Sequence, residues 1–181
     1  MEINILDQQL SGLRPEFYQE LLPPLQGSEI QALEQKYQLT LPEDLKILYS
    51  WKNGQSAGSF DSFVNNSTFL SLQEALEIAA ELTSMIGYDF EIENWWNKNW
   101  IPLFHNGGGD YICYDLEGLF TGNAGQLITF WHAEADRDVI APSLKEFLKA
   151  ITRYYEATPT TAYDEFFEAD EIEGYPKNFE V

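Results

Sequence analysis

The sequence predicts an α+β fold in which an antiparallel β-sheet is flanked by helices within a single domain. In the first half of the chain, apolar residues recur at helical spacing. From Trp100 onwards, short runs rich in β-branched and aromatic residues are separated by turns that contain glycine, a pattern typical of strands joined by hairpins. A further helical pattern begins after Ser143. The length of 181 residues fits one domain.

Four helices are expected before the sheet, within residues 1–27, 28–37, 41–53 and 71–87. The first ends at Pro23-Pro24, because a residue that precedes proline disfavours the helical conformation. Ser28 is an N-cap candidate for the second helix. Pro42 fits the first turn of the third helix, and Asn53-Gly54 ends it. Ser71-Leu72-Gln73-Glu74 matches a capping box and predicts a long fourth helix.

The expected strands lie at residues 100–104, 111–114 and 126–131. Gly107-Gly108-Gly109 joins the first two, since glycine adopts the backbone conformations that hairpin loops need. Pro102 should lie at an edge or a bulge. Ser143-Leu144-Lys145-Glu146 is a second capping box, which opens a helix that closes the sheet. The predicted organisation is a helical lead-in (1–27), the main domain (28–155) and an acidic, aromatic tail (156–181) packed on the domain or extending from it.

The composition is strongly acidic, with 30 Asp and Glu against 10 Lys and Arg and a formal net charge of −20. Such a surface repels nucleic-acid phosphates and anionic lipids, so neither is expected as a partner. The hydrophobic fraction of 44% predicts a folded chain, because disorder combines high charge with low hydrophobicity. The start of the chain lacks a basic stretch, no apolar run could span a membrane, and the single cysteine excludes an internal disulfide. We therefore expect a cytoplasmic protein.

Three patterns could carry catalysis or metal binding, and each has a simpler interpretation. Gly107-Gly108-Gly109-Asp110 lacks the helix and the lysine that follow in a phosphate-binding loop. His132 and three acids alternate along residues 132–138, so an extended strand would place them on one face as metal ligands or as an acidic contact surface. Cys113 could pair with His132 as a nucleophile, but its apolar neighbours favour a buried, inert thiol. We expect no enzyme, no metal and no cofactor.

Acids and tryptophans mark the best candidate for a partner-binding surface. Between Asn53 and Asn97 the chain has no Lys or Arg, and three tryptophans follow within residues 94–100. Exposed tryptophans ringed by acids would dock Arg or Lys through cation–π contacts. Trp100 is expected in the core, whereas the two preceding tryptophans fit the core or the surface equally well. The candidate partner-binding residues are Asp89, Glu91, Glu93, Trp95, Trp96, Glu134 and Asp136.

Two stretches together resemble the SUKH superfamily, which is named partly for fungal cell-wall assembly regulators. The first is residues 29–54, with Leu41-Pro42-Glu43-Asp44-Leu45 and Asn53-Gly54. The second contains Trp100-Ile101-Pro102-Leu103 and Gly107-Gly108-Gly109-Asp110, and Ser143-Leu144-Lys145-Glu146-Phe147-Leu148 resembles the closing helix of the family. The resemblance covers about residues 28–150, and residues 55–99 and the tail depart from it. It implies an α+β binding module without catalytic residues.

The resemblance implies two possible functions. Bacterial members are regarded mostly as immunity proteins, which bind and neutralise a toxin that is often a nuclease. A nuclease needs a basic face for its substrate, so an acidic inhibitor that covers this face gains from the opposite charge. The first hypothesis is therefore an immunity protein whose partner is a toxin with a basic surface. The second, suggested by the fungal members, is a regulatory scaffold or adaptor that binds several cytosolic partners.

Overall fold

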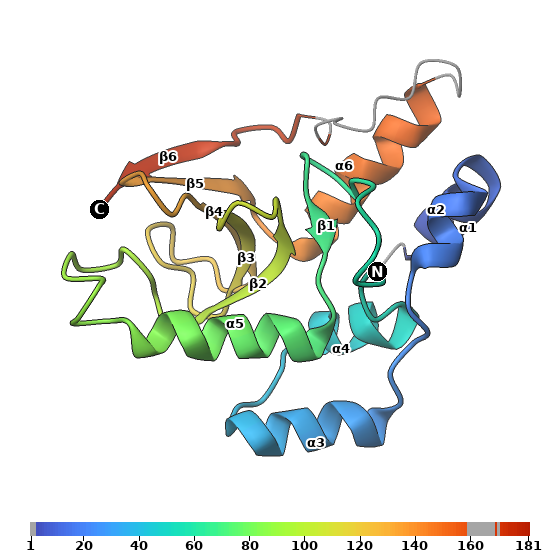
Figure 1. Cartoon of the computed structure of the whole chain (residues 1–181). Coiled ribbons are helices and arrows are strands. Elements are labelled where there is room, and N and C mark those ends of the chain that lie inside the picture. The colour runs from blue at the N-terminus through green and yellow to red at the C-terminus, as the bar shows by residue number, and fades with distance from the viewer. Residues whose placement is uncertain (1–2, 159–168, 170) are drawn as a thin grey trace.

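A computed structural model describes residues 3–158, 169 and 171–181 of the chain (Figure 1). Its helices are α1 (Ile3–Leu13), α2 (Pro15–Glu20), α3 (Gly27–Tyr37), α4 (Glu43–Trp51), α5 (Leu72–Ser84) and α6 (Leu144–Ala157). Its strands are β1 (Thr68–Phe69), β2 (Trp100–His105), β3 (Tyr111–Asp115), β4 (Gln126–Phe130), β5 (Asp136–Ala141) and β6 (Lys177–Glu180). The α+β class predicted from the sequence is confirmed.

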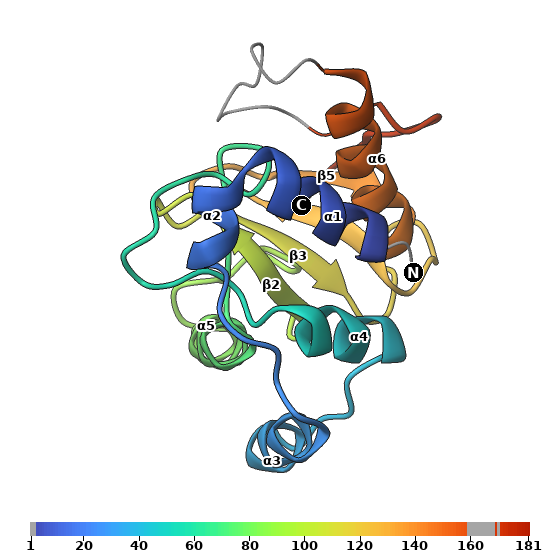
Figure 2. The same ribbon diagram turned by 90° about the vertical axis from the view of Figure 1, so that its right-hand side faces the viewer.

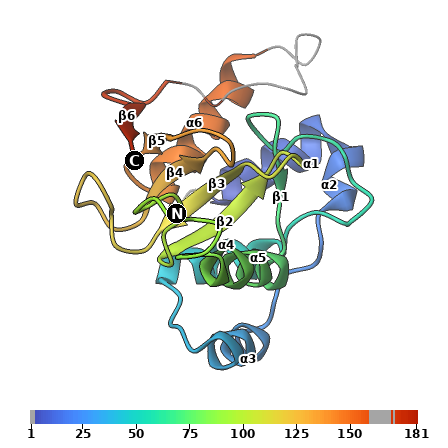
Figure 3. The ribbon, with the colours of Figure 1, turned by 60° about the vertical axis from the view of Figure 1, so that its left-hand side comes forward.

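The described strands form one antiparallel sheet in which each strand pairs with the next along the chain, from β1 to β6. Figure 3 shows this meander, with β1 at one side and β6 at the other. The register between β2 and β3 shifts between Pro102 and Phe104. Pro102 therefore lies at a bulge, as its missing N–H group predicts.

One face of the sheet packs against helices and forms the main core. Figure 2 shows α1 in front of β2 and β3, with α6 beside it and α4 below. Leu6 of α1, Leu45 of α4 and Phe147 of α6 are buried against Phe104 and its neighbours on the sheet. Phe17 of α2 is buried in the same core. The N-terminal lead-in is thus part of the domain, since its apolar residues complete the core.

The opposite face of the sheet carries a second, smaller core. Because side chains alternate along a strand, Tyr114 of β3 faces the main core while Cys113 faces the other side. Cys113 packs there with Ile128 and Phe130 of β4 and with Trp100 of β2, which confirms the core position expected of Trp100. Ala79 and Leu82 of α5 pack against this cluster at one side. Its cover comes from the segment 85–99 between α5 and β2, through Trp95 and Trp96.

The N-terminal region differs from the sequence prediction in two places. Residues 3–20 form two helices instead of one, because Pro15 lacks the N–H group that a continuing helix needs and instead takes the first position of α2. α3 begins at Gly27 and not after Ser28. Its start is fixed by Glu29, whose carboxylate accepts a hydrogen bond of 2.7 Å from the backbone N–H of Gln26.

The two predicted capping signals lie at the helix starts that position the sheet. Ser71 Oγ accepts from the backbone N–H of Glu74 at 3.3 Å, and the Glu74 carboxylate accepts from the backbone N–H of Ser71 at 3.1 Å. Ser143 Oγ accepts from the backbone N–H of Glu146 at 3.3 Å. The starts of α5 and α6 are therefore fixed by local sequence, as expected.

The described part of the C-terminal tail packs on the domain. β6 pairs with β5 and places Phe179 opposite Arg137. The ring of Phe179 stacks on that of Phe120, with centroids 4.8 Å apart. Ile172 packs at the edge of the main core. Three further aromatic residues of the tail, Tyr163, Phe166 and Phe167, lie outside the described residues.

Candidate partner-binding surface

The segment 85–99 carries three of the candidate acids on its outer side. Asp89, Glu91 and Glu93 are exposed. Two apolar residues beside them, Tyr88 and Ile92, are 81% and 51% exposed. Figure 1 shows the segment as the light-green loop that extends beyond the end of α5. It therefore presents acidic and apolar side chains together, and the apolar pair was missed by the sequence analysis.

Trp96 anchors this segment to the second core. Its ring meets those of Trp100 and Phe130 edge to face, with centroids 5.6 and 5.1 Å apart. Its Nε1 donates a hydrogen bond of 3.1 Å to Thr83 Oγ1 of α5. Trp96 is 2% exposed, so its selection as an exposed partner-binding ring is wrong. The sheet face beneath it is apolar, and the ring gains more by covering that face than by remaining in solvent.

Arg137 of β5 joins this segment to the turn between β4 and β5. Its side chain is fully buried, and one terminal nitrogen donates to the carbonyl oxygen of Trp95 at 2.6 Å. The other donates to the carbonyl oxygens of Glu134 at 2.7 Å and Asp136 at 2.6 Å. The guanidinium also lies over the rings of Trp95 and Phe130, 5.2 and 4.9 Å from their centroids. One side chain thus fixes the backbone of both candidate stretches.

The charge of Arg137 is balanced by peptide dipoles. Within the described part of the chain, no carboxylate forms an ion pair with it. Burial lowers the pKa of Arg137, although the nearby Cys113 and Asp136 act in the opposite direction. Its Nε is buried without a hydrogen-bond partner. Backbone carbonyls are the groups that make this burial tolerable, because an unpaired buried charge is very costly.

The remaining candidates lie close to this arginine. Glu134 and Asp136 are exposed, and Trp95 is half-buried beneath the guanidinium. The structure therefore brings the two predicted stretches to neighbouring positions, although they are about forty residues apart in sequence. We call this region the acidic surface. It consists of Asp89, Glu91, Glu93, Glu134 and Asp136, with Tyr88, Ile92 and the edge of Trp95.

A shallow groove of about 450 Å³ follows the segment 85–99. Glu91, Glu93 and Glu117 line it together with the apolar Ile92, and Lys98 also borders it. An arginine or lysine side chain that enters this groove would meet carboxylates and apolar side chains at once. Such a combination favours a cation that carries an apolar stem.

The residues that suggested catalysis or metal binding in the sequence make structural contacts instead. Residues 131–135 form a turn and β5 begins at Asp136, so no continuous strand displays His132 and the three acids as a row. Asp110 Oδ1 lies 2.7 Å from His132 Nδ1, and this contact ties the β2–β3 hairpin to the turn after β4. Cys113 is fully buried, and burial raises its pKa well above the usual value. Among the described residues, no cluster of three or more His, Cys, Asp or Glu side chains is placed to hold a metal ion.

This architecture defines an α+β domain built on an antiparallel meander, with helices over one face and with the segment 85–99 and part of α5 over the other. The chain belongs to the SMI1/KNR4 family (SUKH-1), whose family model matches residues 24–150. The matched range includes Arg137 and both stretches of the acidic surface. A search of curated proteins found no match. None of the helices in the described ranges has the length and apolar character to cross a membrane.

Proposed function

We propose that this protein is a non-enzymatic immunity protein that neutralises a cognate bacterial toxin by covering the toxin's basic substrate face. Membership of the SUKH-1 family supports a role as a binding module. The net charge of −20 supports a basic partner, because opposite charges on two proteins steer their encounter. We further propose that it acts in the cytoplasm, where its buried Cys113 stays a free thiol.

The observation that carries this proposal is the combination of acids and apolar side chains on the acidic surface. Asp89, Glu91 and Glu93 would accelerate association with a basic toxin, an effect that salt weakens. Tyr88 and Ile92 would then bury apolar area in the complex and slow its dissociation. A surface that only kept the protein soluble would not need these two exposed side chains beside the acids.

The Arg137 contacts favour tight binding for a second reason. They hold the carbonyls of Trp95, Glu134 and Asp136 in place before any partner arrives. A preformed surface loses less conformational entropy on binding than a mobile one. The hydrogen bonds of Arg137 thus support a rigid docking face, which suits an inhibitor that must act at low toxin concentration.

A capture experiment with three baits tests this proposal. The baits are the tagged wild type, the surface variant D89N/E91Q/E93Q and the control variant E16Q/E77Q/E156Q. The control removes the same three charges from exposed positions on α2, α5 and α6. Each bait is incubated with lysate of the cells that produce the protein, and the retained proteins are identified. We expect one basic protein that the wild type and the control retain and that the surface variant loses.

The captured protein is then expressed alone and together with each bait. We expect it to arrest growth when expressed alone and to be harmless beside the wild type. A captured protein that is not toxic would contradict the immunity function. Retention of several non-toxic partners would instead support the scaffold or adaptor function. Equal retention by all three baits would contradict the assignment of the acidic surface.

A further inference from the structure

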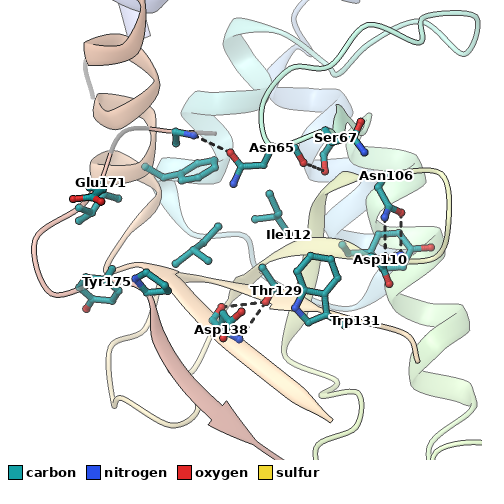
Figure 4. Close-up of a pocket in the computed structure, with 17 residues that line it drawn as sticks. Asn65, Ser67, Asn106, Asp110, Ile112, Thr129, Trp131, Asp138, Glu171 and Tyr175 are labelled. Carbon is teal, nitrogen blue, oxygen red and sulfur yellow. Dashed lines mark hydrogen bonds between the residues drawn. The ribbon is translucent and has the colours of Figure 1, made fainter. Parts of the chain in front are cut away.

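A second site lies on the helix-side face of the sheet, away from the acidic surface. It is a cavity of about 550 Å³, within the range of about 300–1,000 Å³ common for small-ligand sites. Figure 4 shows Ile112 and Thr129 in its middle, surrounded by Asn65 from the loop before β1, Asn106 from the β2–β3 hairpin and Tyr175 from the tail. Five separate parts of the chain thus contribute to one concave site.

Apolar and aromatic side chains form much of the lining of the cavity. Ile112 of β3, Ile140 of β5 and Phe147 of α6 supply aliphatic and ring surface. Trp131 and Tyr175 line the cavity from the end of β4 and from the tail. Ring faces attract cations as well as apolar groups, because the electron density above a ring is negative. The walls therefore suit an apolar stem that ends in a positive charge.

The charged side chains that line the cavity are all acidic. They are Asp110, Asp138 and Glu171, and none of its described lining residues is Lys, Arg or His. Arg137, the neighbour of Asp138 in β5, points to the opposite face of the sheet, where it lies over the ring of Phe130. The potential inside the cavity is thus negative, in addition to the net charge of the whole chain.

Asp138 is placed to receive a cation. One oxygen of its carboxylate accepts a hydrogen bond of 2.6 Å from Asn178 Nδ2. Its backbone N–H donates to Thr129 Oγ1 at 3.1 Å, which fixes its position on the cavity floor. Among the described residues, the second carboxylate oxygen has no hydrogen-bond partner. This oxygen can accept from a guanidinium or an ammonium group without breaking an existing bond.

The surrounding loops are held in a fixed arrangement. Asn65 and Asn66 both have positive φ values of 51°, a conformation that tightens the turn before β1. Asn65 Oδ1 accepts a hydrogen bond of 2.9 Å from the backbone N–H of Ala169, so this loop and the tail are tied together. Asn106 Nδ2 donates to Asp110 at 2.7 Å on another side. The cavity is therefore preformed, which lowers the entropic cost of binding.

We propose that this cavity binds an organic cation, in which a guanidinium or primary ammonium group pairs with Asp138 and an apolar stem packs on Ile112 and Trp131. The cation is either a free amine or the basic side chain of a protein segment, since both offer the same chemistry. This site is independent of the acidic surface and of the toxin partner. It can therefore be tested without knowing that partner.

Calorimetric titration of the full chain with three probes tests the proposal. The probes are agmatine, a capped Gly-Arg-Gly tripeptide and the same tripeptide with citrulline, which keeps the shape of arginine and lacks its charge. We expect the arginine tripeptide to bind at least about tenfold more tightly than the citrulline tripeptide, because the charge-assisted bond to Asp138 is lost. This comparison uses the wild type alone, so a misfolded variant cannot produce it.

Two matched variants locate the site. D138N should weaken binding of the arginine tripeptide about tenfold. E180Q removes the same charge from the paired strand β6, outside both the cavity and the acidic surface, and should change the affinity less than about twofold. Equal binding of the arginine and citrulline tripeptides, equal losses in the two variants, or no binding of either cation would overturn the proposal. If agmatine binds as tightly as the arginine tripeptide, the natural ligand is a free amine; if it binds more weakly, a protein side chain is indicated.

Discussion

At the scale of single residues, Arg137 is a buried charged side chain that joins two separate parts of the chain. It is fully buried, and its guanidinium donates to the backbone carbonyls of Trp95, Glu134 and Asp136. The carbonyls of Trp95 and Glu134 lie in irregular segments, and that of Asp136 belongs to the first residue of β5. Arg137 therefore replaces the hydrogen bonds that a strand or a helix would have supplied.

Replacing Arg137 by Met keeps most of the buried volume and removes these donors. We expect the free energy of unfolding to fall by about 3 kcal/mol, because several buried carbonyls lose their partners. Urea unfolding followed by tryptophan fluorescence measures the change. Lys98→Met, an exposed basic residue in the same segment, is the control and should change stability by less than about 0.5 kcal/mol. Equal stability of R137M and the wild type would show that the hydrogen bonds of Arg137 do not contribute to the free energy of unfolding.

Asp110 links the β2–β3 hairpin to the turn after β4. Its partial burial acts to raise its pKa, but hydrogen bonds from the backbone and ring of His132 and from the Asn106 amide outweigh this effect. The pKa of Asp110 is therefore lower than its ordinary value of 3.8. A carboxyl with a lowered pKa stabilises the fold while it is ionised and loses that contribution as the pH falls through its folded pKa.

The acid dependence of stability should reflect this carboxylate. We expect the free energy of unfolding of the wild type to exceed that of Asp110→Asn near pH 6. The difference should begin to shrink below about pH 4 and continue to shrink as the pH falls through the lowered pKa of Asp110, because the carboxylate becomes protonated. Unfolding curves in urea between pH 6 and pH 3 measure the two proteins side by side. A difference that stays constant over this range would rule out an ionised Asp110 as its source.

At the scale of elements, the end of α4 and the start of α5 meet at a close backbone contact. Asn53 Oδ1 accepts a hydrogen bond of 3.0 Å from the backbone N–H of Leu72. Gly54 has a φ of +82°, and a Cβ atom at this position would lie 2.4 Å from the backbone nitrogen of Ser71. Only glycine satisfies both the conformation and the space. Asn53-Gly54 therefore docks α5 in addition to ending α4.

Gly54→Ala tests this docking. We expect a loss of about 3 kcal/mol in the free energy of unfolding, from the strained conformation and from the forced separation of the two helices. Gly58→Ala is the control, because a Cβ atom at Gly58 meets nothing within 4 Å and its φ is not in the left-handed region. Thermal unfolding followed by circular dichroism compares the two variants. Similar melting temperatures for both would contradict the close contact.

The sequence was sufficient for the elements whose signals are local. The capping residues of α5 and α6 and the β-rich runs of β2, β3 and β4 lie where they were predicted. The strands β1, β5 and β6 were not among those predicted, because their residues form strands only through pairing with neighbouring strands. The alternation of His132 and three acids over residues 132–138 suggested one extended strand. The strand begins only at Asp136, because the buried Arg137 fixes the turn before it.

The candidate site was predictable in part for the same reason. Acidic side chains are seldom buried without a partner, so the exposure of Asp89, Glu91 and Glu93 followed from their type. Tryptophan gives no such indication, and only the packed structure places Trp96 in the core. The exposed Tyr88 could not be identified either, because apolar residues are expected inside unless a structure shows otherwise.

At the scale of the whole molecule, the proposed binding function depends both on the net negative charge and on the placement of the acidic surface. In the proposed function, the net charge of −20 would attract a basic partner over the range of the Debye length, about 8 Å at physiological salt. The acidic surface would then favour one orientation, because Arg137 ties the backbone of its two stretches together. Removing three acids elsewhere on the chain should slow the encounter much less than removing three from the acidic surface, because those elsewhere lie farther from the docking partner.

The association rate constant between this protein and the captured basic partner, measured at low and at physiological salt, is the sharpest test of a docking role for the acidic surface. The wild type and E16Q/E77Q/E156Q should associate at similar rates, which fall as salt is added. D89N/E91Q/E93Q should associate about tenfold more slowly at low salt and show a weaker dependence on salt. Equal rate constants for the two triple variants at both salt concentrations would contradict a docking role for the acidic surface.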